Sequence, residues 1–312
     1  ETRRVWAAHG DHVLERVERV RDPLQRGENI EACLATLDAE LDNVRAALER
    51  FFEGDPEKGC RLANALVEYW DVRSRLTEGR MWLQQALARQ GVSAEQRAHA
   101  LLNAARLGSV QGDLQGGREL AEASLSAYAA LGDERGRVNA LMALGNILAT
   151  LKDEAAATEA YERGLAIQQR LGTDEVVCAM FYNNLATVHH DRQQLDAARE
   201  MGRRALAIFR QRGHRIGQYH VLGTLGRVAF SAGQLDEAQA LLDESLALRR
   251  AVGNKTGVAF TVHNLGQVAA TRGEVNRARA LFTEGLTLAR EIEHGHLTLL
   301  NLGGLAQLCD DA

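Results

Sequence analysis

The polar residues that stand out in this sequence recur at intervals of about 40 residues, as in a repeat array. Several are asparagines, whose amide both donates and accepts hydrogen bonds and so suits an extended peptide backbone. Others are arginines, which hold a carboxylate or a phosphate through two parallel hydrogen bonds. This chemistry is that of ligand binding. The candidate ligand-binding residues are Asn103, Arg106, Asn146, Asn184, His190, Arg227, His263, Asn264 and Gln267.

Two interpretations of these residues stay open. Either at least two of Asn184, Arg227 and Asn264 contact a ligand, or the side chains only bridge neighbouring repeats and bind water. His190 and His263 lie near the same positions, where they would make binding sensitive to pH, although we expect exposed imidazoles without a ligand.

The residues that could serve catalysis, phosphate binding or metal binding form weaker patterns than the candidate ligand-binding residues. Residues 253–256 (GNKT) approximate a phosphate-binding loop but lack the glycine before the lysine, so we expect a turn between repeats. His189 and His190 are adjacent and would point about 100° apart on a helix, which disfavours chelation of one metal. His294 and His296 fall where we expect an exposed turn. The sequence therefore predicts no catalytic residue, no metal and no cofactor.

Two independent series of apolar residues keep one interval of about 40 residues through most of the chain. Two such series in phase are hard to produce by chance, so we predict a repeat array over at least residues 98–300. In an array each unit contacts only its neighbours. The first series is Ala104, Leu144, Leu185, Leu225, Leu265 and Leu305, and the second is Leu125, Leu165, Leu206, Leu246 and Leu286.

Each repeat divides into two helical segments joined by a tight turn. Apolar residues follow one helical face over residues 140–151 and again over 157–167. Mid-helix Gly145, Gly226 and Gly266 should let the second helix approach closely, through the small alanine twelve positions later. Other glycines supply the left-handed residue that ends a helix. These are Gly112, Gly132, Gly172, Gly213, Gly233, Gly253 and Gly273.

With Leu144, Gly145, Ala157, Tyr161 and Gly164 at its signature positions, this unit resembles the tetratricopeptide repeat. The longer unit resembles the subclass found in kinesin light chains, LGN-type adaptors and MalT-type bacterial regulators. The resemblance implies an all-α, right-handed α-solenoid made of helical hairpins. It also implies that the asparagine before Leu-Gly contacts peptide ligands. The departures from the pattern, where we expect the loosest packing, are Gly117 and Gly202.

The composition limits the class of protein. Hydrophobic residues at 46% and charged residues at 25% are typical of a soluble protein, and only two prolines favour a nearly all-helical chain. A net charge of -5 does not favour binding to nucleic acid or to an anionic membrane. Four scattered cysteines indicate reduced thiols in the cytoplasm. Because Glu1 is not an initiator methionine, we expect a part of a larger protein.

Before the repeats, residues 30–51 place apolar side chains at alternating steps of four and three, which is a heptad pattern. Such a seam either joins two chains as a coiled coil or buries its stripe against helices of its own chain. We favour burial within the chain, because the seam is short and a helical array follows. The seam consists of Ile30, Leu34, Leu37, Leu41, Val44, Leu48 and Phe51.

Two sequence segments in the same region carry polar, charged and aromatic residues in a recognisable pattern. They are residues 37–51, with Glu40, Asn43, Arg45 and Leu48, and residues 62–87, with Tyr69, Trp70, Glu78, Gly79, Arg80 and Trp82. In this order they resemble a region of bacterial STAND-type signal-transduction ATPases that leads into C-terminal tetratricopeptide repeats. The resemblance implies a sensor region, with the nucleotide-binding module of that family upstream of Glu1.

The sequence thus predicts three parts: residues 1–97 as irregular helical hairpins, 98–300 as five repeats, and 301–312 as a capping or truncated helix. We expect a non-catalytic scaffold that binds a protein, a peptide or a small effector on a concave face. It would be the sensor or regulatory part of a larger bacterial signalling or transcription-regulating protein, without direct contact to nucleic acid or membrane. The alternative is a structural module that forms a homo-oligomer. The identity of the ligand does not follow from the sequence.

Overall fold

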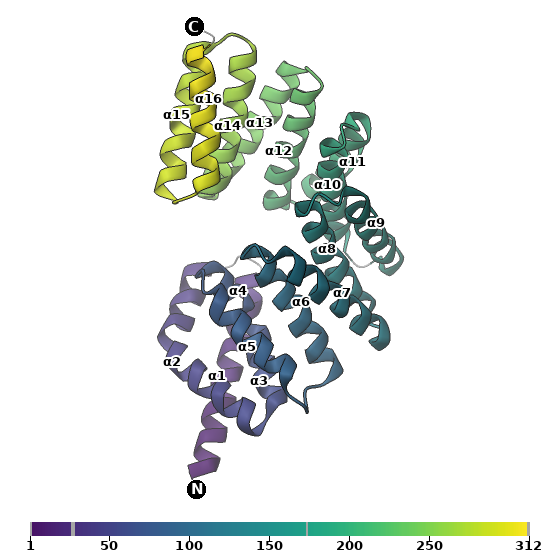
Figure 1. Ribbon diagram of the computed structural model, residues 1–312, viewed down its shortest axis with the longest axis vertical. Coiled ribbons are helices and arrows are strands. Elements are labelled where there is room, and N and C mark those ends of the chain that lie inside the picture. Colours follow the sequence, from purple (N-terminus) through teal and green to yellow (C-terminus); the bar gives the residue numbers. More distant parts are fainter. Residues whose placement is uncertain (1, 26–28, 173, 311–312) are drawn as a thin grey trace. The chain divides into compact units, whose positions relative to one another are not determined.

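The computed structural model describes residues 2–25, 29–172 and 174–310, and these ranges contain sixteen helices and no strand (Figure 1). The predicted all-α class is therefore confirmed. None of the helices described combines the length and the apolar composition needed to cross a membrane. The helices are α1 (Thr2–Gln25), α2 (Ile30–Gly54), α3 (Pro56–Ala65), α4 (Val67–Val72), α5 (Leu76–Ala88), α6 (Ala94–Val110), α7 (Leu114–Leu131), α8 (Glu134–Thr150), α9 (Glu154–Leu171), α10 (Glu175–Asp191), α11 (Leu195–Gln211), α12 (Arg215–Ser231), α13 (Leu235–Ala251), α14 (Lys255–Thr271), α15 (Val275–Glu291) and α16 (Gly295–Asp310).

Tertiary contacts divide the chain into two compact units, unit 1 (Glu1–Ile167) and unit 2 (Gln168–Ala312). Within each unit, consecutive helices of a repeat pack as a hairpin, and the second helix of one repeat contacts the first helix of the next. Stacking of neighbouring hairpins is what an α-solenoid requires.

Glycines end the helices of the repeats, as predicted. In the turns, Gly112, Gly233 and Gly273 have φ angles of 88°, 73° and 75°, a left-handed conformation that glycine adopts without strain. At the equivalent turns Lys152 and Gln193 take φ angles of 63° and 58°. The glycines predicted at the ends of the units are left-handed as well, namely Gly132, Gly172, Gly213 and Gly253.

The mid-helix glycines make room for a large side chain of the second helix. A Cβ atom on Gly145 would lie 2.4 Å from the ring of Tyr161, and one on Gly266 would lie 2.6 Å from the ring of Phe282. The nearest atoms at these two glycines therefore belong to an aromatic ring and not to the expected alanine, whereas at Gly226 the carbonyl oxygen of the expected Ala238 lies 3.5 Å away, beyond the Leu242 side chain. The physical reason is that a missing Cβ lets a buried ring lie flat on the facing helix.

The two departures from the repeat pattern are not loosely packed, contrary to our expectation. A Cβ atom on Gly202 would lie 2.6 Å from the Leu225 side chain, which comes from the next repeat. A Cβ atom on Gly117 would lie 3.2 Å from the Ala105 carbonyl oxygen. Neighbouring groups therefore occupy the space that the missing side chains leave.

The apolar seam of α2 faces the core of unit 1. Leu34, Leu37 and Leu48 are at most 4% exposed and belong to one buried cluster with Trp70. Only the start of the seam is open, because Ile30 is 41% exposed. The burial confirms the interpretation within the chain, and it removes these leucines from any coiled-coil contact.

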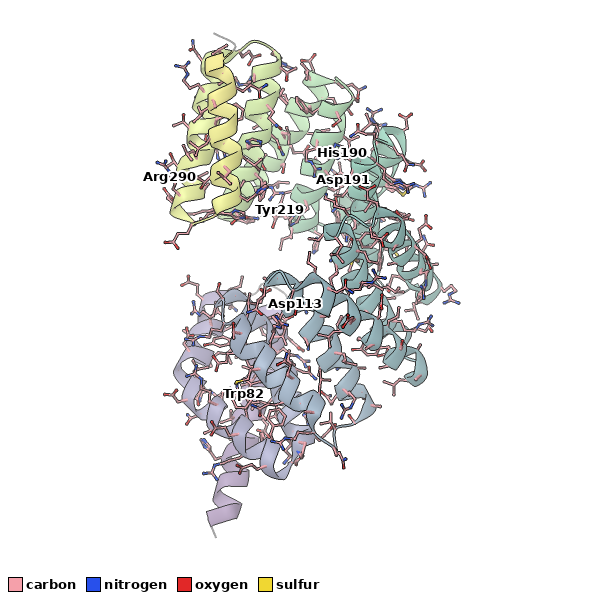
Figure 2. The ribbon with its side chains drawn as sticks, in the orientation of Figure 1. Trp82, Asp113, His190, Asp191, Tyr219 and Arg290 are labelled. Carbon is pink, nitrogen blue, oxygen red and sulfur yellow. The ribbon has the colours of Figure 1, made fainter. Side chains whose placement is uncertain are left out.

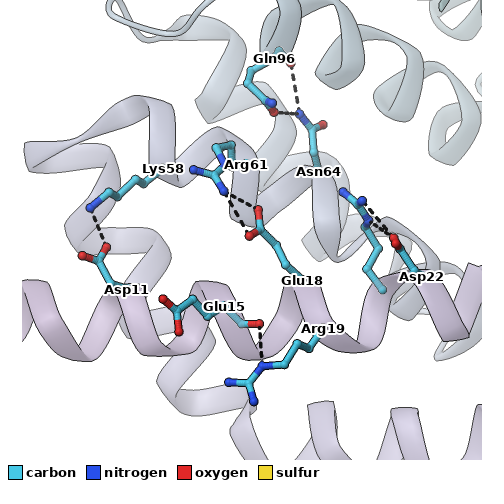
Figure 3. A network of polar contacts seen from close by, with 10 residues as sticks. Asp11, Glu15, Glu18, Arg19, Asp22, Lys58, Arg61, Asn64 and Gln96 are labelled. Atoms are coloured by element: carbon cyan, nitrogen blue, oxygen red, sulfur yellow. Dashed lines mark hydrogen bonds and ion pairs between the residues drawn. The ribbon is translucent and has the colours of Figure 1, made fainter. Parts of the chain in front are cut away.

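Polar contacts attach α1 to α3 (Figure 3). Lys58 Nζ lies 2.6 Å from Asp11 Oδ1, and Arg61 Nη2 lies 2.8 Å from Glu18 Oε1. All four side chains are partly exposed, so each pair contributes about 1 kcal/mol or less. Apolar burial therefore dominates the stability of this region, and the ion pairs orient α1.

The two segments that precede the repeats, residues 37–51 and 62–87, contact each other. Arg45 of α2 pairs with Glu78 of α5 at 2.7 Å between Nε and Oε1. The hydrogen bond from Arg45 holds the pKa of Glu78 below its ordinary value. Trp82 of α5 stacks on Phe52 of α2, with 6.0 Å between ring centroids. Arg45, Glu78 and Trp82 of the two segments, together with Phe52 directly after the first segment, thus fasten α5 to α2.

Candidate ligand-binding site

In unit 2 the first helix of each repeat contacts the first helix of the next repeat. Helix α10 contacts α12, α12 contacts α14, and α14 contacts α16. Side chains at equivalent repeat positions therefore lie on neighbouring helices. The candidate residues of unit 2 are Asn184 and His190 on α10, Arg227 on α12, and His263, Asn264 and Gln267 on α14.

In unit 1 two candidate residues of α6 bond to α3 and α4. Asn103 donates a hydrogen bond to Asn64 Oδ1 at 2.9 Å. Arg106 pairs with Glu68 at 3.2 Å between Nη1 and Oε1. Both contacts are bridges between successive hairpins, which is the second of the two interpretations left open by the sequence.

The remaining candidate of unit 1, Asn146, bonds within its own hairpin. Its Oδ1 accepts a hydrogen bond from the Tyr161 hydroxyl at 2.7 Å. Arg106 and Asn146 also border a cavity of about 200 Å³ between α6 and α8. The structure thus brings these two residues together, but both have partners.

On α10 and α12, His190 and Arg227 contact each other. Arg227 Nη2 lies 3.1 Å from His190 Nδ1 and 3.4 Å from Asp191 Oδ1, and His190 Nε2 lies 2.9 Å from Ser231 Oγ. Figure 2 shows His190 and Asp191 side by side at the end of α10. Burial lowers the pKa of His190, and the charge of Arg227 lowers it further. Asn184 is half-buried and also interacts within the chain.

A cavity of about 340 Å³ lies between α12 and α14, and we name it the α12–α14 cavity. Asn264 lines it and has no side-chain hydrogen bond to any part of the chain that the structure describes. No aspartate or glutamate is among its lining residues. Its polar and charged lining includes His220, Thr224, Arg227, Arg249, Asn254 and Asn264.

A second cavity, of about 540 Å³, lies between α14 and α16 and is lined by His263, Gln267 and apolar side chains such as Phe282. His263 is only 7% exposed, so the expectation of an exposed imidazole was wrong. Its Nδ1 has no hydrogen-bond partner among the described residues. The ring lies 5.5 Å from the Phe282 ring, and burial lowers the pKa of His263. Gln267 is exposed on the same wall.

Arg249 of α13 was not predicted from the sequence. It is only 9% exposed, its Nε donates to Ser245 Oγ at 3.2 Å, and its guanidinium carbon lies 4.6 Å from the centre of the Tyr219 ring. Its repeat position is that of Tyr128 and Phe209, which are core residues in their own repeats. An arginine in a core phase of the repeat is the signal that would have revealed it.

Within the described ranges, no group of three or more His, Cys, Asp and Glu side chains is placed to hold a metal ion. Residues 253–256 form the predicted turn. Gly253 has a φ angle of 69°, and Asn254 caps α14 by accepting a hydrogen bond from the Gly257 amide at 2.8 Å. Residues 253–256 therefore form the turn between two repeats and the N-terminal cap of α14.

Comparison with family models identifies the repeats. A model described as tetratricopeptide repeat matches residues 138–170, and a second model of that description matches residues 177–251 and 219–291. These segments are tetratricopeptide repeats. Helices α8 to α15 fall within or beside the matched residues, and so do the lining residues of the α12–α14 cavity.

Solved structures share the fold at low sequence identity. The apo form of RapI matches 91% of this chain and 100% of its own at 14% identity and a TM-score of 0.70. The apo quorum sensor NprR from B. thuringiensis matches 96% of this chain and 80% of its own, at 14% identity and a TM-score of 0.65. NprR in complex with its cognate peptide NprX matches 93% and 82%, at 15% identity and a TM-score of 0.64. No curated protein matched the sequence.

Proposed function

We propose that this chain is a non-catalytic tetratricopeptide scaffold that binds a peptide or a segment of another protein on the first helices of unit 2. The observation that carries the proposal is that Asn264 and Gln267 of α14 line two cavities without a side-chain hydrogen bond to any described residue. A free amide beside a cavity offers both a donor and an acceptor, which an extended peptide backbone can use. The complex of NprR with a peptide, on a similar fold, supports a peptide ligand.

We propose further that the chain is the sensor part of a larger bacterial signalling or transcription-regulating protein of the cytoplasm. The resemblance of residues 37–51 and 62–87 to STAND-type ATPases supports this context. Ligand binding would bias an upstream switch to the extent that the ligand prefers one state of the repeats. The net charge of -5 supports neither nucleic acid nor an anionic membrane as the partner. A small effector in place of the peptide would use the same cavities.

One observation favours a second candidate function, a homo-oligomerisation module. Leu299 and Leu302 of α16 are 70% and 42% exposed, and exposed apolar side chains on one helix can pack against a second copy. Light scattering over a hundredfold range of chain concentration separates the two functions. A monomer at every concentration would remove the oligomer, whereas a dimer that Leu299→Glu dissociates would establish it.

Peptide binding is tested by selection from a phage-displayed peptide library on the immobilised chain, followed by fluorescence anisotropy with the enriched peptides. We expect the double variant Asn264→Ala/Gln267→Ala to lose about tenfold or more in affinity, because it lacks the free amides. Glu244→Ala is the matched control, since Glu244 is exposed on α13 and lines neither cavity. The proposal fails if no peptide is enriched, or if enriched peptides bind the double variant as tightly as the wild type.

A further inference from the structure

Arg249 is a buried positive charge without an acidic partner. It is 9% exposed, and no carboxylate of the described residues lies within ion-pair distance of its guanidinium. Its neighbours are neutral: the Ser245 hydroxyl, the Tyr219 carbonyl oxygen at 3.5 Å and the Tyr219 ring. A charge withdrawn from water is unfavourable unless a counter-charge or a full set of hydrogen bonds replaces the water.

The side chain of Arg249 borders the α12–α14 cavity, and one nitrogen of its guanidinium has no acceptor among the described residues. Nε and Nη2 donate to Ser245 and Tyr219, whereas Nη1 donates to no described residue. Arg249 is one of the lining residues of the cavity. A guanidinium presents five N–H donors in a planar fork that matches a carboxylate. Nη1 lies beside Gly257 at the cavity wall, so it is a donor without an acceptor among the described residues.

The surroundings of Nη1 are positive. The first turn of α14 reaches the cavity through Thr256 and Gly257, and a helix N-terminus attracts anions. Arg227 of α12 also lines the cavity, and its nearest carboxylate, Asp191 at 3.4 Å, is not a lining residue. No lining residue is acidic. Charge, donors and space all point to an anion as the missing partner of Arg249.

We propose that the α12–α14 cavity binds a carboxylate of the ligand on the guanidinium of Arg249. The carboxylate is the C-terminus or an acidic side chain of the bound peptide, so the inference rests on the proposed peptide-binding function. Asn264, which lines the same cavity, holds the adjoining backbone. A bidentate Arg–carboxylate pair fixes the orientation of the peptide as well as its affinity.

The first test uses small probes and observes the Arg249 Nε–H resonance by NMR. N-acetylglutamate should shift this resonance with a dissociation constant on the order of 1–10 mM, which is typical of one ion pair in a small ligand. N-acetylglutamine, which lacks the side-chain charge and is used as its C-terminal amide, should leave it unchanged. Inorganic phosphate that binds more tightly than N-acetylglutamate would overturn the assignment to a carboxylate.

The second test supplies the missing counter-charge from within the chain. Asn254→Asp keeps the cap of α14, since aspartate and asparagine cap helices about equally, and adds a carboxylate at the cavity wall. We expect affinity for N-acetylglutamate to fall at least about tenfold. The control is Gln239→Glu, which adds the same charge on α13 beside Arg272, away from the cavity. Equal affinity of Asn254→Asp and wild type would overturn the proposal.

The two proposals fail in different ways. If selected peptides lose affinity with the Asn264→Ala/Gln267→Ala variant but not with Asn254→Asp or on replacement of their carboxylates by amides, the carboxylate site is wrong and peptide binding stands. If N-acetylglutamate binds at Arg249 and no peptide is enriched, the anion site stands and the proposed function is wrong.

Discussion

In both units the end of a second helix packs on the start of the next first helix, and we call this contact the joint. An aromatic side chain fills the joint in unit 1, and a charged side chain fills it in unit 2. In unit 1 Tyr128 of α7 is fully buried against Gly136 of α8, where a Cβ would lie 2.1 Å from its ring. Three repeats later Arg249 takes the place of Tyr128, and a Cβ on Gly257 would lie 2.0 Å from Arg249 Nη1. Glycine at this position thus leaves room for whichever long side chain the second helix offers.

One hydrogen bond to the backbone is the same in both joints, whereas the surrounding side chains differ. Ser124 donates to the Ala98 carbonyl at 2.9 Å in unit 1, and Ser245 donates to the Tyr219 carbonyl at 2.8 Å in unit 2. The lining differs more. Where unit 1 packs the apolar Leu102 against its ring, unit 2 has a glycine, and a cavity lies there. A structural contact thus becomes a candidate binding site when a few core positions change, without any change of fold.

The largest expected loss of stability comes from adding a methyl group at the glycine of the joint in unit 1. Gly136→Ala should destabilise the chain by about 2–3 kcal/mol, because the added methyl meets a buried, rigid ring at 2.1 Å. Gly257→Ala should cost under about 1.5 kcal/mol, since the contacted atom is the end of a flexible arginine that can move into the cavity. Urea unfolding of the full chain measures both. Equal losses would show that the two joints are equally rigid.

A serine occupies the same position in both joints, and its loss should affect them differently. Ser124→Ala removes one hydrogen bond to a carbonyl and should cost about 0.5–1 kcal/mol. Ser245→Ala also removes the acceptor of Arg249 Nε, and it should cost about 1.5–2 kcal/mol because a buried charged donor loses its partner. Chemical denaturation in parallel gives the difference. A smaller loss at Ser245 than at Ser124 would mean that water already solvates Arg249.

Much of the fold was predictable because the repeat fixes local signals. The left-handed glycines such as Gly233 and the buried stripe of α2 depend on chain conformation and apolar spacing, which a sequence displays directly. The partner of Gly145 was not predictable in this way. Which side chain of the second helix faces a glycine depends on how two helices cross, and that angle is a result of packing.

The site was predictable only in part, for a related reason. Asn103 and Asn264 share one repeat position, yet Asn103 bonds to Asn64 of the preceding hairpin and Asn264 bonds to no described residue. The sequence shows the position of an amide but not whether a neighbouring helix supplies its partner. Arg249 was missed because a charged residue on a second helix is usually solvated, and only its alignment with Tyr128 and Phe209 marks it as a core residue.

A pH titration tests whether unit 2 contains a further uncompensated polar group. Burial lowers the pKa of His263 below 6.5 in the folded chain, so the unfolded chain takes up a proton first. Stability should be complete above pH 6.5 and fall as the pH drops toward the folded pKa, by up to about 1.4 kcal/mol at one unit below. His263→Gln should reduce this loss in thermal unfolding of the full chain. An identical pH dependence of variant and wild type would assign the loss to other groups.

The smallest effect expected is a gain, and it depends on the cap residues of the two joints. The cap of α8 is Asp133 and that of α14 is Asn254, and each accepts a hydrogen bond from a glycine amide. Asn254→Asp should stabilise the chain by about 1 kcal/mol at low salt, because the new carboxylate pairs with the guanidinium of Arg249. Asp133→Asn should change stability by less than about 0.5 kcal/mol, since asparagine caps equally well and the joint of unit 1 is built around the uncharged Tyr128. Thermal unfolding at two salt concentrations checks both, and the gain should shrink at high salt as the new ion pair is screened. No gain for Asn254→Asp, or a gain that does not depend on salt, would mean that the new carboxylate forms no ion pair with Arg249, and Arg249 would then have no need of an anion.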